Sequence, residues 1–276
     1  MDPAILGLDG KIALVTGAGR NIGKGCATML AKAGCHVCVV DIDPEAGRQA
    51  MKEIAAMGRN AHFIQADVRD IDQIEAMVRE TVRALGGLDV AVNNVGGWGP
   101  YSQTPFLEAS RQYFADVVAF NFQSTFFCVQ AQARSMVERK VKGSIINVAS
   151  AGGLRARYGS SPYGASKGAV INLTMQAAFE LGRLGVRVNC IAPALVPKDT
   201  MRTRVSDGSL QPVVDGNPLR RLPSAEEVGG VALFLASDLS SYVTGHTIPV
   251  DGGDTITSAL GGVTSTGAKF MGMMGR

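Results

Sequence analysis

Three side chains in the middle of the sequence have the types and spacing for proton transfer to an alcohol. Ser150 ends a β-branched segment, and Tyr163 and Lys167 follow as Tyr-Gly-Ala-Ser-Lys. Residues four apart share a helix face, so the lysine can stand beside the phenol. A nearby ammonium lowers the pKa of a phenol, which can then exchange a proton with an alcohol that the serine polarises. Tyr–Lys pairs also occur by coincidence on helix surfaces; the strand-end serine and a nucleotide-binding turn in the same chain argue against coincidence.

That turn is the glycine-rich segment Thr-Gly-Ala-Gly-Arg-Asn-Ile-Gly at positions 16–23. It follows an apolar segment and leads into a helical pattern, so backbone N–H groups and the positive end of a helix dipole would face an anion. Gly17 permits a tight turn, Gly23 permits close packing of helix on strand, and Asn21 tolerates a positive φ. Glycines also mark ordinary turns, and the context of a strand–turn–helix unit is what favours a phosphate site.

An acidic residue, Asp41, ends the next predicted strand, 18 positions after Gly23. An acid at this place binds both ribose hydroxyls of NAD and repels the 2′-phosphate of NADP. The alternative is that Asp41 caps the helix that begins at Pro44, a role for which Asp43 is better placed. Arg20 is a basic side chain that could reach a 2′-phosphate. The sequence therefore predicts NAD as the cofactor, with NADP as the less favoured alternative.

Segments rich in β-branched residues alternate with segments of helical period along most of the chain. The predicted strands are 11–16, 36–41, 61–66, 88–93, 144–149 and 186–192, and helices are predicted at 22–33, 44–57 and 71–85. Apolar strands separated by helices indicate a doubly wound α/β fold with a parallel sheet covered on both faces. Two segments break this rhythm. Residues 194–223 are proline-rich and are interpreted as a substrate lid, and residues 254–276 as an extension or a frayed terminus.

The composition is that of one α/β domain with little net charge. The chain has 276 residues, 46% hydrophobic and 18% charged, with a net charge of +3, which is enough for one sizeable core. The basic residues are scattered, which argues against nucleic acid as a partner. The densest basic cluster, 134–142, is typical of a solvated helix end. No apolar run reaches the roughly 18 residues of a membrane span, and the first residues do not look like a signal peptide.

The cysteines favour neither disulfides nor a metal site. Their number is odd, and none lies in a Cys-x-x-Cys pair or at metal-ligand spacing from a histidine: Cys26, Cys35, Cys38, Cys128 and Cys190. Several fall in apolar patterns, where a reduced thiol behaves as a small hydrophobe. We therefore expect a protein of the reducing cytoplasm that uses no metal.

Residues 8–253 together resemble the short-chain dehydrogenase/reductase family. The motifs that carry the resemblance are the turn at 16–23, Asp67-Val68, Asn-Asn-Val-Gly-Gly at 93–97, Asn121, Ser150, Tyr-Gly-Ala-Ser-Lys at 163–167, Asn-Cys-Ile-Ala-Pro-Ala at 189–194 and the segment 243–253. The resemblance implies a single-domain Rossmann fold with a seven-stranded sheet over 1–253, followed by an extension at 254–276. It also implies a nicotinamide-dependent alcohol dehydrogenase or ketoreductase that forms a homotetramer through helices around 113–139 and 162–184.

The resemblance implies a catalytic tetrad. Tyr163 matches the general acid/base, Lys167 the residue that lowers the tyrosine pKa and binds the nicotinamide ribose, Ser150 the donor to the substrate oxygen, and Asn121 the holder of a water in the proton relay. The predicted cofactor-binding residues are Gly17, Arg20, Asn21, Ile22, Gly23, Asp41, Ile42, Asp67, Val68, Asn94, Gly96, Tyr163, Lys167, Pro193 and Val196.

Within this cofactor set the family assigns places along the dinucleotide. Asp67 and Val68 match adenine contacts, and Asn94 and Gly96 match positions on the adenosine ribose side. Residues 193–196 match the stretch that runs over the nicotinamide.

The chain departs from the family pattern at three places. Asn21 stands where the family's turn has glycine, and Val95 stands where it has alanine after the paired asparagines. The usual Pro-Gly after the sixth strand is Pro193-Ala194, and the threonine expected soon after it is displaced to Thr200. The last change leaves open which hydroxyl holds the nicotinamide carboxamide.

The substrate end is less specific in sequence. The predicted contacts are Trp98, Gly152, Leu154 and Ser160, with the lid at 194–223. This mixture of aromatic and apolar residues predicts a hydrophobic secondary alcohol, cyclic or steroid-like. Trp98 and Leu154 have simple packing as an alternative. Arg155 and Arg157 lie near the predicted mouth, where solvated loop charges are commoner than a site for an acidic substrate.

Three other functions remain open from sequence. A 3-oxoacyl thioester reductase would favour NADPH, which Asp41 argues against. A dinucleotide-sensing regulator without catalysis would have lost a tetrad residue, whereas this chain has all four. An epimerase or dehydratase of nucleotide sugars shares the Tyr-Lys motif but has a second substrate lobe. We also expect Phe270-Met271 in the extension to lie at a subunit boundary.

Overall fold

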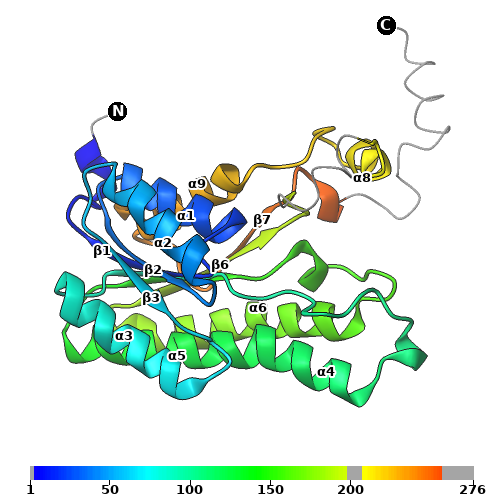
Figure 1. Ribbon diagram of the computed structural model, residues 1–276, viewed down its shortest axis with the longest axis horizontal. Helices are drawn as coiled ribbons and strands as arrows, with labels where there is room; N and C mark the ends of the chain where they lie inside the picture. The colour runs from blue at the N-terminus through cyan, green and yellow to red at the C-terminus, as the bar shows by residue number, and fades with distance from the viewer. Residues whose placement is uncertain (1–2, 198–206, 257–276) are drawn as a thin grey trace, which may run out of the picture.

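The computed structural model describes residues 3–197 and 207–256, which form one parallel sheet between two layers of helices (Figure 1). The strands are β1 (Ile12–Thr16), β2 (His36–Asp41), β3 (Ala61–Gln65), β4 (Val90–Asn93), β5 (Ser144–Val148), β6 (Arg187–Pro193) and β7 (Thr247–Val250). Their order is β3-β2-β1-β4-β5-β6-β7, and every neighbouring pair is parallel. The predicted doubly wound, seven-stranded fold is confirmed. The strand order reverses between β1 and β4, and a crevice for a ligand is expected at the carboxyl ends of these two strands.

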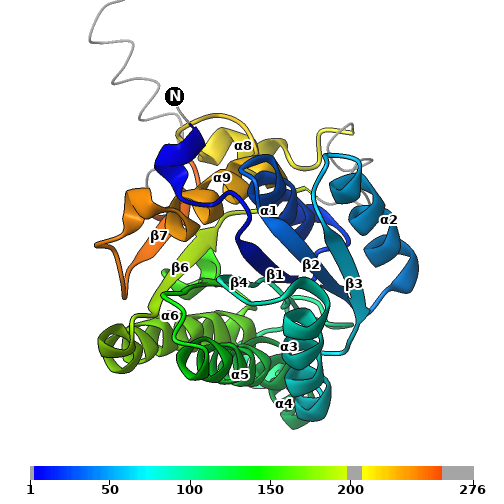
Figure 2. The same cartoon turned by 90° about the vertical axis from the view of Figure 1, so that its left-hand side faces the viewer.

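Figure 2 shows the two helical layers on opposite faces of this sheet. One layer holds α1 (Asn21–Lys32), α2 (Pro44–Ala55) and α9 (Ala225–Ala236), which share an apolar cluster with β1 and β2. The other holds α3 (Ile71–Leu85), α4 (Arg111–Val118), α5 (Ser124–Glu138) and α6 (Ser161–Leu181). A π-helical turn, η3 (Ala119–Gln123), joins α4 to α5. The short 3-10 turns are η1 (Pro3–Leu6), η2 (Phe106–Glu108), η4 (Ala151–Gly153), η5 (Gly182–Leu184), η7 (Asp238–Ser240) and η8 (Asp254–Ile256).

The predicted elements agree with the observed ones to within two residues at either end. The segment predicted as an irregular lid is the exception, because it contains the helix α8 (Gln211–Gly216). Thr200 lies in the part of this segment outside the described residues, and so do Phe270 and Met271. No helix among the described residues is long and apolar enough to cross a membrane. All five cysteines are buried free thiols.

Two glycines set the distance between α1 and α9. A Cβ atom on Gly229 would lie 2.5 Å from the carbonyl oxygen of Gly25, and a Cβ on Gly25 would overlap the carbonyl oxygen of Ala225. These obstacles are backbone atoms, so no side-chain rotation relieves them. The close contact holds α1 in place and with it the turn that precedes the helix.

We predict that Gly229→Ala lowers the free energy of unfolding by about 1–3 kcal/mol, because the added methyl group forces the two helices apart. Gly230→Ala is the matched control, since a Cβ there meets nothing within 4 Å. In a helix interior that change should stabilise by about 0.5–1 kcal/mol. Urea unfolding of both variants measures the difference, and equal effects would contradict the packing argument.

Candidate active site

The four predicted tetrad residues lie together at the carboxyl ends of β4 and β5. Ser150 follows β5 and begins η4, whereas Tyr163 and Lys167 lie on the first two turns of α6. Asn121 lies in the π-helical turn, a feature that is frequent at functional sites. A Cβ placed on Gly96 would be 2.6 Å from Oδ1 of Asn121 and 2.7 Å from Nζ of Lys167. The absence of a side chain at this position lets the two polar groups converge under the loop that follows β4.

Lys167 is a buried cation with a defined partner. The residue is 2% exposed. Its Nζ donates a hydrogen bond of 2.8 Å to the carbonyl oxygen of Val148 on β5. Burial lowers the pKa of Lys167 to about 8. This hydrogen bond ties the start of α6 to the end of β5, so the lysine also fixes the position of the neighbouring phenol.

Tyr163 differs from the sequence expectation in the direction of its pKa. Burial raises the pKa of Tyr163, while a hydrogen bond with Ser150 and the charge of Arg157 act in the opposite direction. The expectation of a pKa lowered by Lys167 is wrong for this structure, because desolvation of the phenolate is the largest effect. A phenol that is protonated near neutral pH is well suited to donating a proton to a ketone.

Asn121 is hydrogen-bonded to the loop that follows β4. Its Oδ1 accepts a hydrogen bond of 2.9 Å from the backbone N–H of Gly97, and its Nδ2 donates to the carbonyl oxygens of Gly97 and Val117, each at 2.8 Å. The residue is fully buried. Both amide donors are thus used by the protein, so this side chain holds the loop against the helix. Its backbone carbonyl accepts from the hydroxyl of Thr125 at 2.7 Å.

The glycine-rich turn has the geometry of a cradle. Gly17 has a φ of 62°, and Asn21 has a φ of 46°, which confirms the positive φ that the sequence predicts. A Cβ on Gly23 would overlap the carbonyl oxygen of Gly17, so glycine is required for this close packing. The first turn of α1 has no side-chain cap, whereas Asp43 and Asp70 cap α2 and α3. The uncapped N–H groups suit the pyrophosphate of a dinucleotide.

Asp41 is fixed against that turn. Its Oδ2 accepts a 2.8 Å hydrogen bond from the N–H of Gly19, and its Oδ1 accepts a 3.0 Å bond from the N–H of Asp43. Asp43 caps α2 and also binds Arg20 at 2.6 Å. Helix capping therefore does not explain Asp41, and the guanidinium of Arg20 already has an anionic partner.

Several other predicted cofactor positions have roles within the fold. Nδ2 of Asn94 donates to the carbonyl oxygens of Thr16 and Gly17 at 3.2 and 3.3 Å and so ties β4 to β1. Val68 is 4% exposed and packs in the apolar core. Both carboxylate oxygens of Asp67 bind Arg69.

The remaining positions of the cofactor set lie at the start of α1 and at or just beyond the ends of β2 and β6. Ile42 is 55% exposed directly beyond Asp41, and Ile22 packs partly buried on the α1 side. Pro193 ends β6, and Val196 is buried at 6% exposure.

Trp98 lies directly against the reacting tyrosine. Its indole stacks on the ring of Tyr163 with 5.1 Å between centroids and 17° between planes. Gly152 is adjacent, because a Cβ there would lie 3.5 Å from Oγ of Ser150 and 3.6 Å from Cε1 of Tyr163. Leu154 is 42% exposed. Ser160 is buried, and its hydroxyl has no hydrogen-bond partner among the described residues.

Sequence reasoning missed a link between this region and the end of the described chain. Arg155 binds the carbonyl oxygen and the carboxylate of Asp254 at 2.7 and 2.6 Å. Its side chain is 34% exposed and therefore partly withdrawn from solvent. No local pattern signals a pair of residues 99 positions apart. Arg155 is thus committed to the fold and is not a free cation for an acidic substrate.

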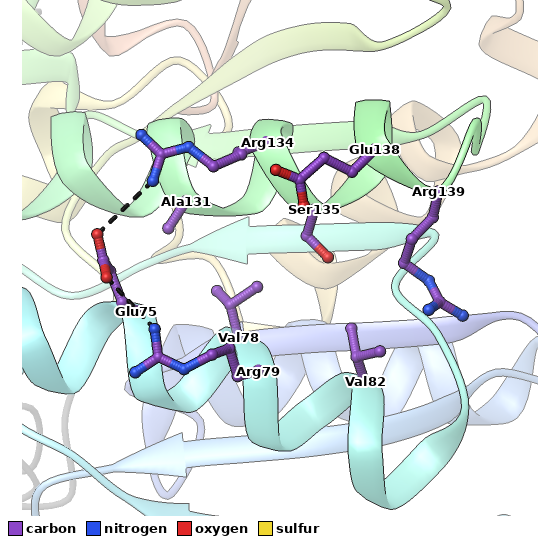
Figure 3. Close-up of a pocket in the computed structure, with 9 residues that line it drawn as sticks. All are labelled: Glu75, Val78, Arg79, Val82, Ala131, Arg134, Ser135, Glu138 and Arg139. Carbon is purple, nitrogen blue, oxygen red and sulfur yellow. Dashed lines mark hydrogen bonds and ion pairs between the residues drawn. The ribbon is translucent and has the colours of Figure 1, made fainter.

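A shallow groove on the outer surface between α3 and α5 lies apart from the tetrad (Figure 3). Two of its three arginines share one carboxylate, because Glu75 lies 3.3 Å from Arg79 and 3.7 Å from Arg134. Arg139 donates to the carbonyl oxygen of Gly86. The basic cluster of the sequence is therefore a solvated helix end, as predicted.

Comparison with known proteins supports a redox function. The family model described as enoyl-(acyl carrier protein) reductase matches residues 17–255. A cyclohexanol dehydrogenase from a Rhodococcus species is 39% identical over 265 residues, which cover 91% of this chain and 98% of that protein. A 3-oxoacyl-(acyl-carrier-protein) reductase from Staphylococcus aureus is 37% identical and is covered to 97% by a match over 88% of this chain.

The fold is shared with a 7α-hydroxysteroid dehydrogenase solved with NADH and 7-oxo-glycochenodeoxycholic acid. The two chains superpose with a TM-score of 0.83 at 32% identity, over 89% of this chain and 94% of the other. The match to the family model extends over the nucleotide turn from Gly17 onward, the tetrad and the strands β2 to β7. The chain belongs to the short-chain dehydrogenase/reductase family of oxidoreductases.

Proposed function

We propose that this enzyme interconverts a hydrophobic, cyclic secondary alcohol and its ketone with NAD(H). The observation that carries the proposal is the environment of Tyr163, which has Ser150 at its hydroxyl and the indole of Trp98 on its ring face. Lys167 lies one helical turn further along α6. The polar side of this arrangement handles a proton, and the aromatic side favours an apolar substrate.

Each residue has a part in the reaction. In alcohol oxidation Tyr163 takes the hydroxyl proton of the substrate, and in ketone reduction it returns that proton. Ser150 donates a hydrogen bond to the substrate oxygen as negative charge develops there. Lys167, held by Val148, is placed to bind the nicotinamide ribose. A bound nicotinamide supplies or accepts the hydride.

The preference for NAD follows from two carboxylates at the end of β2. Asp41 holds its carboxyl group beside the turn, where a bound NADP would carry its 2′-phosphate. Asp43 forms an ion pair with Arg20, the basic side chain that could neutralise that phosphate. Both effects favour the unphosphorylated ribose. Asp67, Asn94 and Gly96 would then shape the adenosine side of the site.

A cyclic substrate is supported by the aromatic wall at Trp98 and by relatives that include a cyclohexanol dehydrogenase. The alternative is reduction of a 3-oxoacyl thioester, which the Staphylococcus aureus relative favours. Asp41 argues against that alternative through the cofactor. A non-catalytic regulator is the least supported function, because the tetrad is complete and assembled.

The same proposal extends to assembly and location. Phe126 on α5 and Met175 and Phe179 on α6 are 39%, 45% and 83% exposed, which supports a homotetramer built through these two helices. The five buried free thiols support a location in a reducing cytoplasm. The described part of the lid and the start of the extension are proposed to adjoin the substrate. In support, Asp254, the first residue of the extension, binds Arg155, which follows Leu154.

We predict that Tyr163→Phe lowers kcat at least about 100-fold, because a general acid/base contributes about 10²–10⁴-fold. The dissociation constant for NADH should not change. In the wild type, alcohol oxidation should rise with pH, since the phenol has a raised pKa and must be deprotonated to act as the base; ketone reduction should fall. Steady-state rates and NADH fluorescence titration check this, and retention of more than a hundredth of the activity would refute the assignment.

We predict a higher kcat/KM with NAD than with NADP, and a smaller difference after Asp41→Asn. The amide keeps an acceptor for the N–H of Gly19 but removes the charge that repels a 2′-phosphate. Asp43→Asn should also improve NADP use, since it keeps the helix cap and releases Arg20. Initial rates with both cofactors decide the matter; a wild type that prefers NADP would overturn the role given to Asp41.

We predict that Trp98→Ala raises KM for cyclohexanol about 10-fold but changes KM for 2-propanol by less than about threefold, because aromatic contact area is lost only to the larger ring. Trp98→Phe should retain most of the discrimination. Trp98 is the single tryptophan of the chain, so its fluorescence reports cyclohexanol binding directly. Equal losses for both alcohols, or no change in fluorescence, would reduce Trp98 to a packing residue.

A further inference from the structure

We propose that a buried chain of hydrogen bonds through Asn93, Gln132, Asn147 and Thr174 positions the elements that carry the tetrad. None of these four residues is part of the proposed tetrad or of the dinucleotide site. The inference rests on the function proposed above, because it assigns positioning residues to that reaction.

The chain of bonds crosses two strands and two helices. Asn93 and Asn147 are register partners on β4 and β5. Nδ2 of Asn93 donates to Oδ1 of Asn147 at 3.0 Å and to Oε1 of Gln132 at 2.9 Å, and Nε2 of Gln132 donates back to Oδ1 of Asn93 at 2.7 Å. Nδ2 of Asn147 donates to Oγ1 of Thr174 at 3.0 Å, and that hydroxyl donates to the carbonyl oxygen of Val170 at 2.9 Å. β4, β5, α5 and α6 are thereby joined.

These polar groups lie in the apolar core beneath the active site. Gln132, Asn147 and Thr174 are fully buried, and Asn93 is 2% exposed. Apolar side chains could pack in several registers at such a place, whereas amides must meet at hydrogen-bond distance or remain unpaired at a high cost. A slip of one residue between β4 and β5 would turn one asparagine to the other face of the sheet. The bonds therefore select one arrangement of the four elements.

Each member lies on an element that also carries part of the site. Asn93 precedes Gly96 by three residues, and Asn147 precedes Ser150 by three. Thr174 follows Lys167 by seven residues on α6, two turns along the same face. Gln132 lies on α5, the helix that continues from the π-helical turn of Asn121.

A second set of bonds joins the same elements nearer the substrate. Asn121 binds the backbone of Gly97, and Lys167 binds the carbonyl oxygen of Val148. α6 is thus held against β5 at two positions along its length, Lys167 and Thr174. A helix held at two positions resists both rotation and tilt. Loss of the bonds through Asn93, Gln132, Asn147 and Thr174 leaves every proposed catalytic group present but free to shift. A misplacement of about 1 Å at a reacting centre costs about 100-fold in rate.

The test uses Thr174→Val in the full-length protein. Valine has a similar shape but lacks the hydroxyl, so Nδ2 of Asn147 loses its acceptor and the link to α6 is broken. We expect kcat to fall about 10- to 100-fold, while the dissociation constant of NADH stays within about twofold. Thr174→Ser restores the hydroxyl and should restore kcat.

Two controls separate positioning from stability. Ile54→Val removes a buried methyl group from the opposite helical layer and should lower Tm without changing kcat. The quadruple variant Asn93→Leu/Gln132→Met/Asn147→Leu/Thr174→Val replaces the whole bonded set by apolar groups and leaves no amide of the set unpaired, so stability should largely return while kcat stays low. Recovery of kcat together with Tm, or failure of serine to rescue, would overturn the proposal.

The quadruple variant also serves if Thr174→Val does not fold. The outcome is independent of the substrate and cofactor assignments, because all variants are compared on whichever alcohol the wild type oxidises. Failure of the proposed acid/base instead shows itself in Tyr163→Phe.

Discussion

The buried ammonium of Lys167 is the constraint on which the catalytic half of the molecule depends. A cation without solvent needs an oriented acceptor, and here it is the carbonyl oxygen of Val148 at the end of β5. The bond requires α6 to approach the strand closely. It also requires glycine at position 96 of the loop that follows β4, since a Cβ there would lie 2.7 Å from Nζ of Lys167. Asn121 completes the enclosure by holding Gly97, so one charge dictates the path of a helix, a strand end and a loop.

The nucleotide half obeys a different constraint, the close packing of a turn on its own helix. Gly23 has no room for a side chain against Gly17, and α1 is in turn held by its glycine contact with α9. This packing presents the uncapped N–H groups of α1 and places Gly19 within reach of Asp41. The two halves meet where the strand order reverses, between β1 and β4, and Asn94 bonds directly across that boundary. The glycine-rich turn and the tetrad are thus held by separate networks that share one edge of the sheet.

Local patterns in the sequence were enough for six of the seven strands and for much of the candidate site, whereas β7 was implied only by the family resemblance. β-Branched runs locate strands because buried parallel strands need such side chains, and the positive φ of Asn21 follows from the glycine pattern around it. The pairing of Arg155 with Asp254 and the stacking of Trp98 on Tyr163 depend on how distant segments pack, which no local spacing encodes. The pKa of Tyr163 was misjudged for the same reason: spacing shows that Lys167 is near, whereas burial is a property of the whole fold. The helix α8 was missed because its segment is short and rich in proline and polar residues.

The contrast between the two sides of Tyr163 explains why the sequence predicts the class of reaction more sharply than the substrate. On one side Ser150, Lys167 and Asn121 are anchored by strand ends and helices, and their bonds leave little freedom. On the other side Trp98 comes from a loop, and its contact with the phenol is a stacking of faces that sets no unique partner. Change in that loop alters the apolar wall without disturbing the buried amides below. A fold built in this way keeps one proton-transfer geometry while the shape of the alcohol it accepts can vary.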